Sequence, residues 1–318
     1  MKRLSVLIIV IFVLVGGFFL WWNNGIMAVN KQDKSNKIFV VSKGKGVREL
    51  ANELKKEGLI RDPVVFFLLV KQMGLDDDIQ AGDFRLSPSM SAAKIADSLT
   101  HGTLDIWVTI PEGQRAEEIA AMLKEKIPTY SDDWRGKLNL EEGYLFPDTY
   151  LIPRSADINF IISLLKNTFN TRYATIPPTT TKLSQEEIVT LASLIEREAI
   201  TDAEKPIIAG ILMNRLNAGM PLQVDATIQY AKGQNPITKK WWAPVTLAEY
   251  KSVVSPYNTY LQPGLPPGPI ANPGIVALQA AANPADTDYV YYLHDKNGVI
   301  RYAKTLDGHN ANIEKYGL

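Results

Sequence analysis

Cysteine is absent from the 318-residue chain, and histidine occurs only three times. The lack of cysteine excludes disulfide frameworks, thiolate zinc sites, iron–sulfur clusters and a cysteine nucleophile. The histidines, His101, His294 and His309, are too few and too scattered for a histidine-based metal site. We therefore expect neither a metal ion nor another cofactor.

An excess of charge of either sign is also missing. Lysine and arginine number 34, aspartate and glutamate number 34, and the formal net charge is zero. Proteins that bind nucleic acids usually carry a basic excess or a basic stripe, so we expect no nucleic-acid partner. Hydrophobic residues make up 46% of the chain, which is enough for a folded core, and the length suits two domains.

The N-terminal segment 4–22 carries no charged residue and has about the length needed to cross a hydrocarbon core as a helix. Lys2 and Arg3 precede it, and the next charge is Lys31, so the positive-inside rule puts the N-terminus in the cytoplasm. The alternative is a cleaved signal peptide, but no small-residue cleavage site follows closely. We expect a single-pass anchor in the cell (inner) membrane, with the remaining chain on the periplasmic side.

A pattern of strand, turn and amphipathic helix recurs in segments 38–54, 83–99 and 107–123. In each helix, apolar residues at i, i+1 and i+4 form one face. The pattern predicts that this face is buried through Leu50, Leu54, Ile95, Leu99, Ile119 and Leu123.

The second half of the chain mixes helices with long loops. Capping boxes at Ser184–Glu187 and Thr201–Glu204 predict two helices, the second ending near Gly219. Segment 289–303 predicts a terminal β-hairpin. The fold class is therefore α+β, and we expect a cytoplasmic stub and transmembrane anchor over 1–24, a tether over 25–36, a β-α module over 37–125 and a larger domain over 126–318.

Chemistry in this chain is expected to rest on carboxylates, because no G-x-S-x-G, Walker A or H-E-x-x-H motif is present. In the helix LASLIEREAI (191–200), periodicity buries Ile195 and turns Arg197 toward solvent. Glu196 and Glu198 flank the buried stripe on either side. A flanking carboxylate is normally a solvated helix charge, and periodicity does not choose between the two.

Several motifs together resemble the YceG-like endolytic murein (peptidoglycan) transglycosylases. Their order and spacing match over about residues 37–318, and the anchor matches as well. The motifs are EGYLFPDTY (142–150), LASLIEREA (191–199), ILMNRL (211–216), MPLQVDATIQY (220–230), SPYNTYLQPGLPPGPIANPG (255–274), ALQAAANPA (277–285) and HN (309–310).

The resemblance implies a LysM-like module near 38–105 and a mixed α/β C-terminal catalytic domain. It implies that Glu196 is the catalytic acid and base. It further implies that the substrate is a peptidoglycan glycan strand, cut at the bond between N-acetylmuramic acid and N-acetylglucosamine, with peptidoglycan synthases as further partners. The muramic C6 hydroxyl supplies the nucleophile and leaves a 1,6-anhydro end, so one carboxyl group is enough, and an apolar, partly desolvated setting would keep it protonated.

Other residues of the same motifs are weaker candidates for binding the glycan. They offer amide, hydroxyl and aromatic groups of the kind that bind sugars: Gln223, Asp225, Tyr257, Asn258, Thr259, Tyr260 and Asn272. Glu198 and Glu142 are candidates for support of the site. For each of them the alternative is a structural role, because such residues often hold turns through backbone hydrogen bonds.

Two other functions fit the sequence. One is a non-catalytic peptidoglycan-binding scaffold of the cell-wall synthesis machinery, for which the module and the anchor would suffice. The other is a hydrolytic muramidase in which Glu196 works with a second acid such as Asp225. The products separate the three functions: anhydro ends, no cleavage, or reducing ends.

Overall fold

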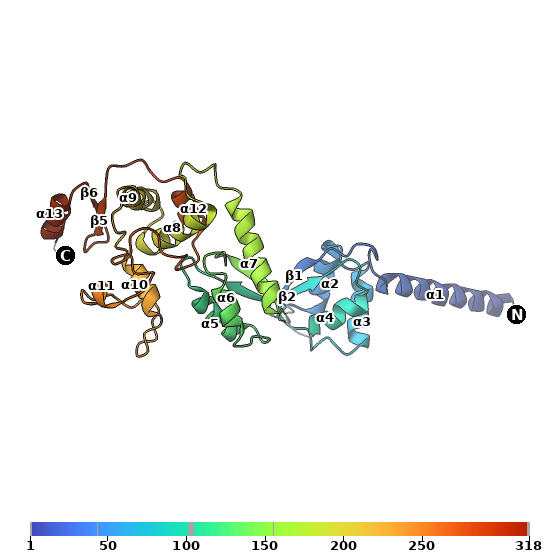
Figure 1. The fold of residues 1–318 in the computed structure, drawn as a ribbon. Helices are drawn as coiled ribbons and strands as arrows, with labels where there is room; N and C mark the ends of the chain where they lie inside the picture. Colours follow the sequence, from blue (N-terminus) through green and yellow to red (C-terminus); the bar gives the residue numbers. More distant parts are fainter. Residues whose placement is uncertain (1, 43, 101–104, 155, 317–318) are drawn as a thin grey trace. The chain divides into compact units, whose positions relative to one another are not determined.

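The computed structural model describes residues 2–42, 44–100, 105–154 and 156–316, with side chains described from residue 12 onward (Figure 1). Contacts along the chain divide it into two compact units. Unit 1 comprises Met1–Ile106 with Leu151–Ser155, and unit 2 comprises Trp107–Tyr150 with Ala156–Leu318. The first division falls earlier in the chain than the predicted domain boundary at residue 125. Both units mix helices with small sheets, which confirms a mixed α and β fold.

Unit 1 is built from helices and one antiparallel strand pair. Its elements are α1 (Lys2–Ile26), β1 (Lys37–Val41), α2 (Val47–Lys56), α3 (Pro63–Gln72), β2 (Gly82–Leu86) and α4 (Ala92–Thr100). Strand β1 pairs with β2, so that Lys37 lies opposite Leu86 and Val41 opposite Gly82. The strand β3 (Asp105–Thr109) follows α4 in the chain and pairs with β4 (Thr149–Pro153).

The three predicted strand–helix units are present, as β1 with α2, β2 with α4, and β3 with α5 (Ala116–Lys126). All six predicted core residues are buried, which confirms the predicted helix faces. Helix α3 is an element that the sequence analysis did not predict. It begins where the Asp62 side chain accepts hydrogen bonds from the backbone N–H groups of Val64 and Val65.

The end of α1 packs onto α3 within unit 1. Gly25 lies so close to Val65 that a Cβ atom at this position would clash with the valine side chain. The Trp21 indole N–H donates to Asp62 at 3.0 Å, and the Arg61 guanidinium donates to the carbonyl of Ala28 at 2.8 Å. The predicted tether 25–36 is therefore held against unit 1 at its beginning.

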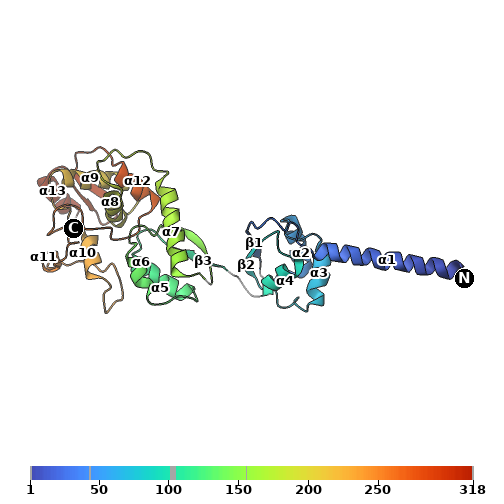
Figure 2. The same ribbon diagram turned by 45° about the vertical axis from the view of Figure 1, so that its right-hand side comes forward.

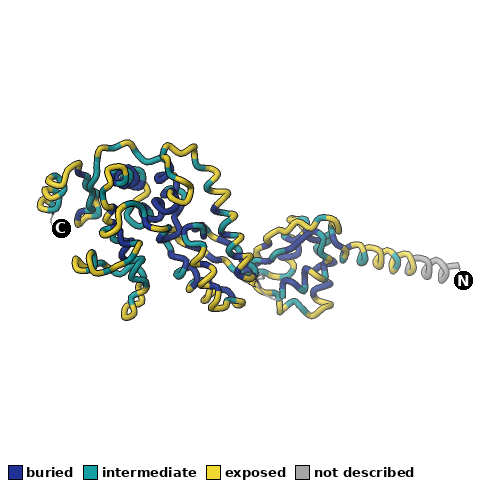
Figure 3. The backbone as a smooth tube through the Cα atoms, viewed as in Figure 1, coloured by how far each residue is buried: buried dark blue, intermediate teal, exposed yellow. Residues whose placement is uncertain are grey.

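The described side chains of α1 before Trp21 are mostly exposed, and Figure 3 shows this part of the helix largely in yellow. Phe12, Leu14, Phe19 and Leu20 are among the exposed apolar residues. Among the residues whose side chains the structure describes, from residue 12 onward, no helix has both the length and the apolar character needed to span a membrane.

Unit 2 contains most of the helices. After α5 follow α6 (Trp134–Asn139), β4, α7 (Ile158–Tyr173), α8 (Gln185–Glu198), α9 (Lys205–Asn217), α10 (Asp225–Lys232), α11 (Glu249–Ser252), α12 (Ile275–Ala282), β5 (Tyr291–His294), β6 (Ile300–Ala303) and α13 (Leu306–Tyr316). Helices α8, α9 and α12 lie side by side, as both Figure 1 and Figure 2 show. These three helices form the centre of the unit 2 core.

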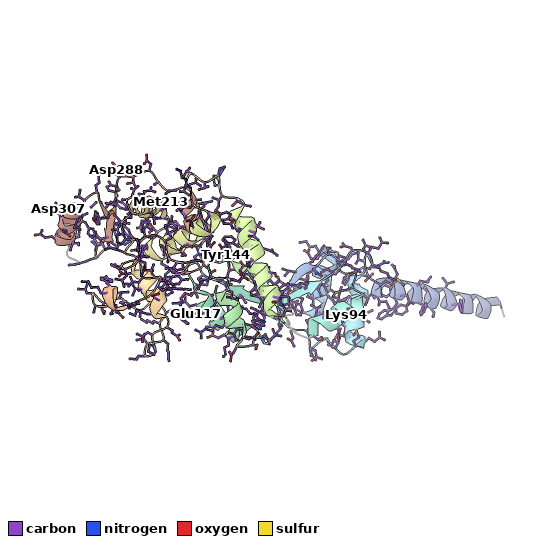
Figure 4. The ribbon with its side chains drawn as sticks, viewed as in Figure 1. Lys94, Glu117, Tyr144, Met213, Asp288 and Asp307 are labelled. Atoms are coloured by element: carbon purple, nitrogen blue, oxygen red, sulfur yellow. The ribbon has the colours of Figure 1, made fainter. Side chains whose placement is uncertain are left out.

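Helix α8 is buried on all sides between Ile188 and Ile195, rather than along the single predicted stripe. The reason is that α9, α12 and the loop before α12 surround it. On the side of α7, the ring of Tyr144, labelled in Figure 4, packs against that of Phe169 in an edge-to-face arrangement, with the ring centres 5.0 Å apart. A helix covered in this way can carry a polar side chain at its end into a fixed position.

Two further predictions concern chain reversals. The terminal hairpin is confirmed, with Tyr291 opposite Ala303 and a turn closed by the hydrogen bond from the Gly298 N–H to the Asp295 carbonyl. Helix α9 begins only at Lys205, later than the predicted cap at Thr201. The Glu204 carboxylate instead accepts hydrogen bonds from the backbone N–H groups of Ile200 and Thr201, which makes a turn before the helix.

Two phenylalanines of α7 test the assignment of the core. Phe169 is buried, whereas Phe160 is exposed on the same helix. We expect Phe169→Ala to lower the free energy of unfolding by about 3–5 kcal/mol, because it leaves a cavity in the core. Phe160→Ala should change it by no more than about 0.5 kcal/mol. Denaturant titration of the full chain measures both, and equal losses would contradict this core.

Candidate active site

Glu196 owes its position to the cap at the start of α8. The Ser184 hydroxyl accepts a hydrogen bond from the Glu187 backbone N–H, and the Glu187 carboxylate accepts one from the Ser184 N–H. This capping box, which the sequence predicted, fixes the beginning of the helix. The helix ends at Glu198, where Ala199 takes an extended conformation, so Glu196 lies in the last turn.

The Glu196 carboxylate is held at both oxygens. The Lys205 ammonium donates to Oε1 at 3.0 Å, and the Gly274 backbone N–H donates to Oε2 at 3.0 Å. Gly274 is the N-cap of α12, whose N-terminal dipole favours a negative charge. The Glu196 side chain is only 8% exposed. The expected desolvation is therefore present, but the expectation of an apolar setting is wrong, because the partners of Glu196 are an ammonium and a backbone amide.

Lys205 lies at the centre of the site and is 5% exposed. Its ammonium is 2.8 Å from Asp202, 3.0 Å from Glu196 and 3.7 Å from Glu112. Burial lowers the pKa of Lys205, but the hydrogen bond to Asp202 and the carboxylates of Glu196 and Glu112 outweigh this and raise it above the ordinary value. Three carboxyl groups thus surround one cation. Within the described residues, no group of three or more His, Asp or Glu side chains is arranged to hold a metal ion.

Glu112 is a residue of this site that the sequence analysis missed. It lies in the turn after β3, and its side chain is 47% exposed. Burial raises the pKa of the Glu112 carboxyl, the negative charge of Glu196 raises it further, and Lys205 partly opposes both. The only signal in the sequence is the Pro-Glu-Gly turn at 111–113, and nothing in its spacing links it to α8.

Gly113 allows this turn to approach α8. Its φ of 73° is in the left-handed region, which favours glycine. A Cβ atom at Gly113 would lie 3.2 Å from the Arg197 guanidinium and 3.5 Å from the Glu196 side chain. A glycine at this position therefore keeps Glu112 next to the end of the helix.

The prediction that Arg197 faces solvent is wrong. Its guanidinium lies 3.9 Å from the centre of the Trp242 ring and donates to the Gly113 carbonyl at 3.5 Å. Burial lowers the pKa of Arg197. The periodicity of α8 did not reveal this because Trp242 belongs to a loop far along the chain.

Trp242 is part of an aromatic cluster that the sequence analysis also missed. The Arg115 guanidinium lies 4.2 Å from the Tyr230 ring centre and 4.8 Å from that of Trp241. The Trp242 indole N–H donates to Glu118 at 3.0 Å. The adjacent tryptophans at 241–242 were the available signal, and the cluster connects α5, α8 and α10 next to Glu196.

Glu198 belongs to a second group, apart from Lys205. The Tyr292 hydroxyl donates to the Glu198 carboxylate at 2.7 Å. Burial raises the pKa of Glu198, and the charge of Asp225 raises it further against this hydrogen bond. Asp225 in turn accepts a hydrogen bond from the Tyr260 hydroxyl at 2.6 Å. The Tyr292 hydrogen bond joins the end of α8 to the hairpin strand β5, and support of the site by Glu198 stays a prediction.

Glu142 and Asn272 hold the loops around the site. The Asn272 side-chain amide donates to Glu142 at 2.9 Å and to the Gln114 carbonyl at 3.0 Å. Glu142 also accepts the backbone N–H of Ala116 at the start of α5. Burial raises the pKa of Glu142 to about 8, against the effect of the Ala116 N–H. Together the two side chains fix the segment that carries Glu112.

The remaining candidates divide by exposure. Asn258, Thr259 and Asn272 are buried and hydrogen bonded within the chain, as in the donation from the Asn258 side-chain amide to the Val253 carbonyl at 2.8 Å. Sugar contact by these three stays a prediction, and what the structure shows is that they hold loops. Tyr257 and Tyr260 are half-buried, and Gln223 is exposed. Gln223 has a φ of 54°, a strained conformation that is common at functional sites.

Comparison with known proteins identifies similar sequences and one similar structure. The sequence model of the family described as YceG-like matches residues 39–315. A Bacillus subtilis (strain 168) protein named endolytic murein transglycosylase is 34% identical, over 95% of this chain and 91% of the relative. A Streptococcus pneumoniae (strain D39) protein of the same name is 27% identical, over 98% of this chain and 64% of the relative. A crystal structure of a yceG-like protein from Listeria monocytogenes superposes with a TM-score of 0.56 at 27% identity, over 87% of this chain and 99% of that one.

The raised pKa of Glu142 predicts a pH-dependent stability. In the folded chain Glu142 keeps its proton up to about pH 8, whereas in the unfolded chain it loses it near the ordinary value of 4.5. Unfolding therefore releases a proton between these values, and the free energy of unfolding should fall as the pH rises from about 5 to about 8. In Glu142→Gln this part of the decrease in the free energy of unfolding should be absent, whereas in Glu141→Gln it should remain. Denaturant titrations at both pH values provide the measurement, and equal slopes in the two variants would refute the assignment.

Proposed function

We propose that this chain, which belongs to the YceG-like family, is a membrane-anchored endolytic murein transglycosylase that cuts within the glycan strands of peptidoglycan. The observation that carries the proposal is the position of Glu196. It is the residue that the family resemblance assigns as the acid and base, and its carboxylate is covered and fixed at the end of a buried helix. The relatives named endolytic murein transglycosylase match almost the whole chain.

The reaction needs one group that first gives and then takes a proton. Glu196 donates a proton to the oxygen between N-acetylmuramic acid and N-acetylglucosamine, and the bond from that oxygen to the muramic C1 breaks. The C6 hydroxyl oxygen of the same muramic residue then bonds to C1, and its proton returns to Glu196. The product is a 1,6-anhydro end, and no water is consumed.

The contacts of Glu196 suit this double role. Lys205 and the Gly274 N–H each hold one carboxylate oxygen, so the side chain does not need to be oriented when the substrate arrives. Both donors also stabilise the negative charge that Glu196 carries after the first proton transfer. Asp225, the second acid of the muramidase alternative, is bound by the Tyr260 hydroxyl and does not share these donors.

The membrane anchor is α1. Segment 4–22 has no charge, and the described apolar side chains of this helix before Trp21 are mostly exposed, which supports contact with lipid. The order β1, α2, α3, β2 with an antiparallel strand pair supports a LysM-like module in unit 1. Such an anchor would keep the catalytic unit on the periplasmic side near newly made glycan strands, where peptidoglycan synthases are the expected partners.

Glu196→Gln tests the role of Glu196. This change keeps the size of the side chain but removes the transferable proton, so we expect the rate of glycan cleavage to fall by about 10²–10⁴-fold or more. Glu186→Gln, at the exposed first turn of the same helix, should leave the rate unchanged. The assay is mass spectrometry of fragments released from uncrosslinked glycan strands.

The same assay separates the three functions. Anhydro-ended fragments, one water lighter than hydrolysed ones, support the transglycosylase. Reducing ends from the unmodified chain would indicate a muramidase, and the absence of fragments would indicate a scaffold. Near-normal anhydro product from Glu196→Gln would overturn the role of Glu196 and direct attention to Glu198 or Asp225.

The topology has its own test. A reporter fused after Leu318 that is active only outside the cytoplasm should be active, because the anchor places the C-terminal part in the periplasm. Mass spectrometry of the membrane-extracted protein should show that segment 4–22 is retained. A mature chain that begins after about residue 22–28 would instead indicate a cleaved signal peptide.

A further inference from the structure

Glu112 and Glu196 contact the same two residues, Lys205 and Gly274. Both carboxyl groups face the Lys205 ammonium, at 3.7 Å and 3.0 Å. Both also lie against Gly274, whose N–H binds Glu196 and whose missing side chain leaves the space that the Glu112 carboxyl fills. The two acids come from segments far apart in the sequence, the turn after β3 and the end of α8. They therefore form a pair within unit 2.

The groups that face Glu112 and Glu196 include one cation and one further carboxylate. Lys205 of α9 faces both acids, and Asp202 of the preceding turn adds a third carboxylate at 2.8 Å from the same ammonium. From α8, Arg197 points to Trp242 and to the carbonyl of Gly113. The loop before α12 contributes only the backbone N–H of Gly274 to Glu196. Two negative charges on adjacent carboxyl groups repel each other, so this arrangement favours one proton on the pair.

Exposure differs between the two acids. The Glu196 side chain is 8% exposed, and the Glu112 side chain is 47% exposed. Glu196 is thus covered by its own partners, whereas Glu112 is open to solvent beside it. A proton from solvent reaches Glu112 more easily than Glu196. The raised pKa of Glu112, caused by burial and by the charge of Glu196, agrees with a proton that rests there.

We propose that Glu112 is the proton-sharing partner of Glu196, so that a single proton belongs to the two carboxyl groups while Lys205 neutralises the remaining negative charge. The inference rests on the proposed function, because it concerns the acid of that reaction. Glu112 acts through Glu196 and is a positioning residue.

The proposed proton transfer neither gains nor loses a proton over one reaction cycle. In the resting pair the proton is on Glu112, and Glu196 is the carboxylate bound to Lys205. The O–H bond at Glu112 breaks, one forms at Glu196, and the negative charge moves to Glu112. Glu196 then protonates the glycosidic oxygen as the bond to C1 breaks, and the proton of the C6 hydroxyl returns to the pair. One proton leaves and one returns, so the pair is reset without a further reactant.

The test is the pH dependence of glycan cleavage by the full chain and three variants, Glu112→Gln, Glu112→Asp and Glu125→Gln. Gln at 112 removes one of the two carboxyl groups that share the proton and, with it, the repulsion between them, so the loss of activity at high pH should begin at lower pH than in the unmodified chain. We expect kcat to fall about 10- to 100-fold with KM within about two-fold, since the substrate contacts stay the same. Asp at 112 should restore most of the pH profile.

Glu125→Gln is the matched control, because Glu125 is exposed near the end of α5 in the same unit. It should match the unmodified chain at every pH. If Glu112→Gln keeps the unmodified pH profile, whatever its rate, Glu112 is merely structural and the inference is wrong. If Glu112→Asp restores the rate but not the profile, the inference is also wrong.

A second measurement does not need activity. In Glu196→Gln the charge next to Glu112 is gone, so Glu112 should lose its proton at lower pH than in the unmodified chain. Carbon-13 NMR of glutamate carboxyl groups, with Glu112 assigned from Glu112→Asp, measures this shift, and an unchanged titration would overturn the pairing. An unmodified chain that releases no fragments would count against the proposed function, while this titration would still decide on the pair.

Discussion

The buried ammonium of Lys205 is the interaction on which the arrangement of the site depends. A cation with so little exposure is tolerated only when carboxylates surround it, and removal of one partner would leave an uncompensated charge. The partners come from the turn after β3, the end of α8 and the turn before α9. These three segments must therefore meet at one point. The Glu204 carboxylate, bound to the N–H of Ile200 and to His294, fixes the short connection that makes the meeting possible.

The core of unit 2 fixes the place where these three segments meet around Lys205. Helices α8, α9 and α12 pack on one another, so the first residues of α9 and α12 and the last residues of α8 are placed together. Loops then complete the site, because Asn272 binds both Glu142 and the carbonyl of Gln114. Gly143 belongs to this loop framework, since its φ is 87° and a Cβ atom would clash with Pro269. The chemistry thus lies where helix ends and tightly packed loops converge.

The sequence predicted what depends on local pattern. The helix faces with Leu50 and Ile119, the capping box of α8 and the terminal hairpin are set by residues close together in the chain, and the structure confirms them. The family resemblance identified Glu196, which periodicity alone could not separate from Glu198. Local pattern did not reveal Glu112 or the contact of Arg197 with Trp242, because both depend on packing between distant segments. The same limit applies to Asn258, whose buried hydrogen bonds follow from the path of its own loop.

The packing of α1 onto α3 has a mechanical consequence. Trp21 and Gly25 of α1 contact Asp62 and Val65 at the start of α3, and Arg61 donates to the Ala28 carbonyl just after α1. This end of the helix is therefore fixed to the rest of unit 1. A flexible linker lets a domain sample many heights, with a mean reach that grows only as the square root of its length. A helix that is packed against its domain is instead a stiff spacer, and its length changes by about 1.5 Å for each residue. With the proposed anchor in segment 4–22, the docked end of α1 would hold the rest of unit 1 at a set distance from the lipid surface.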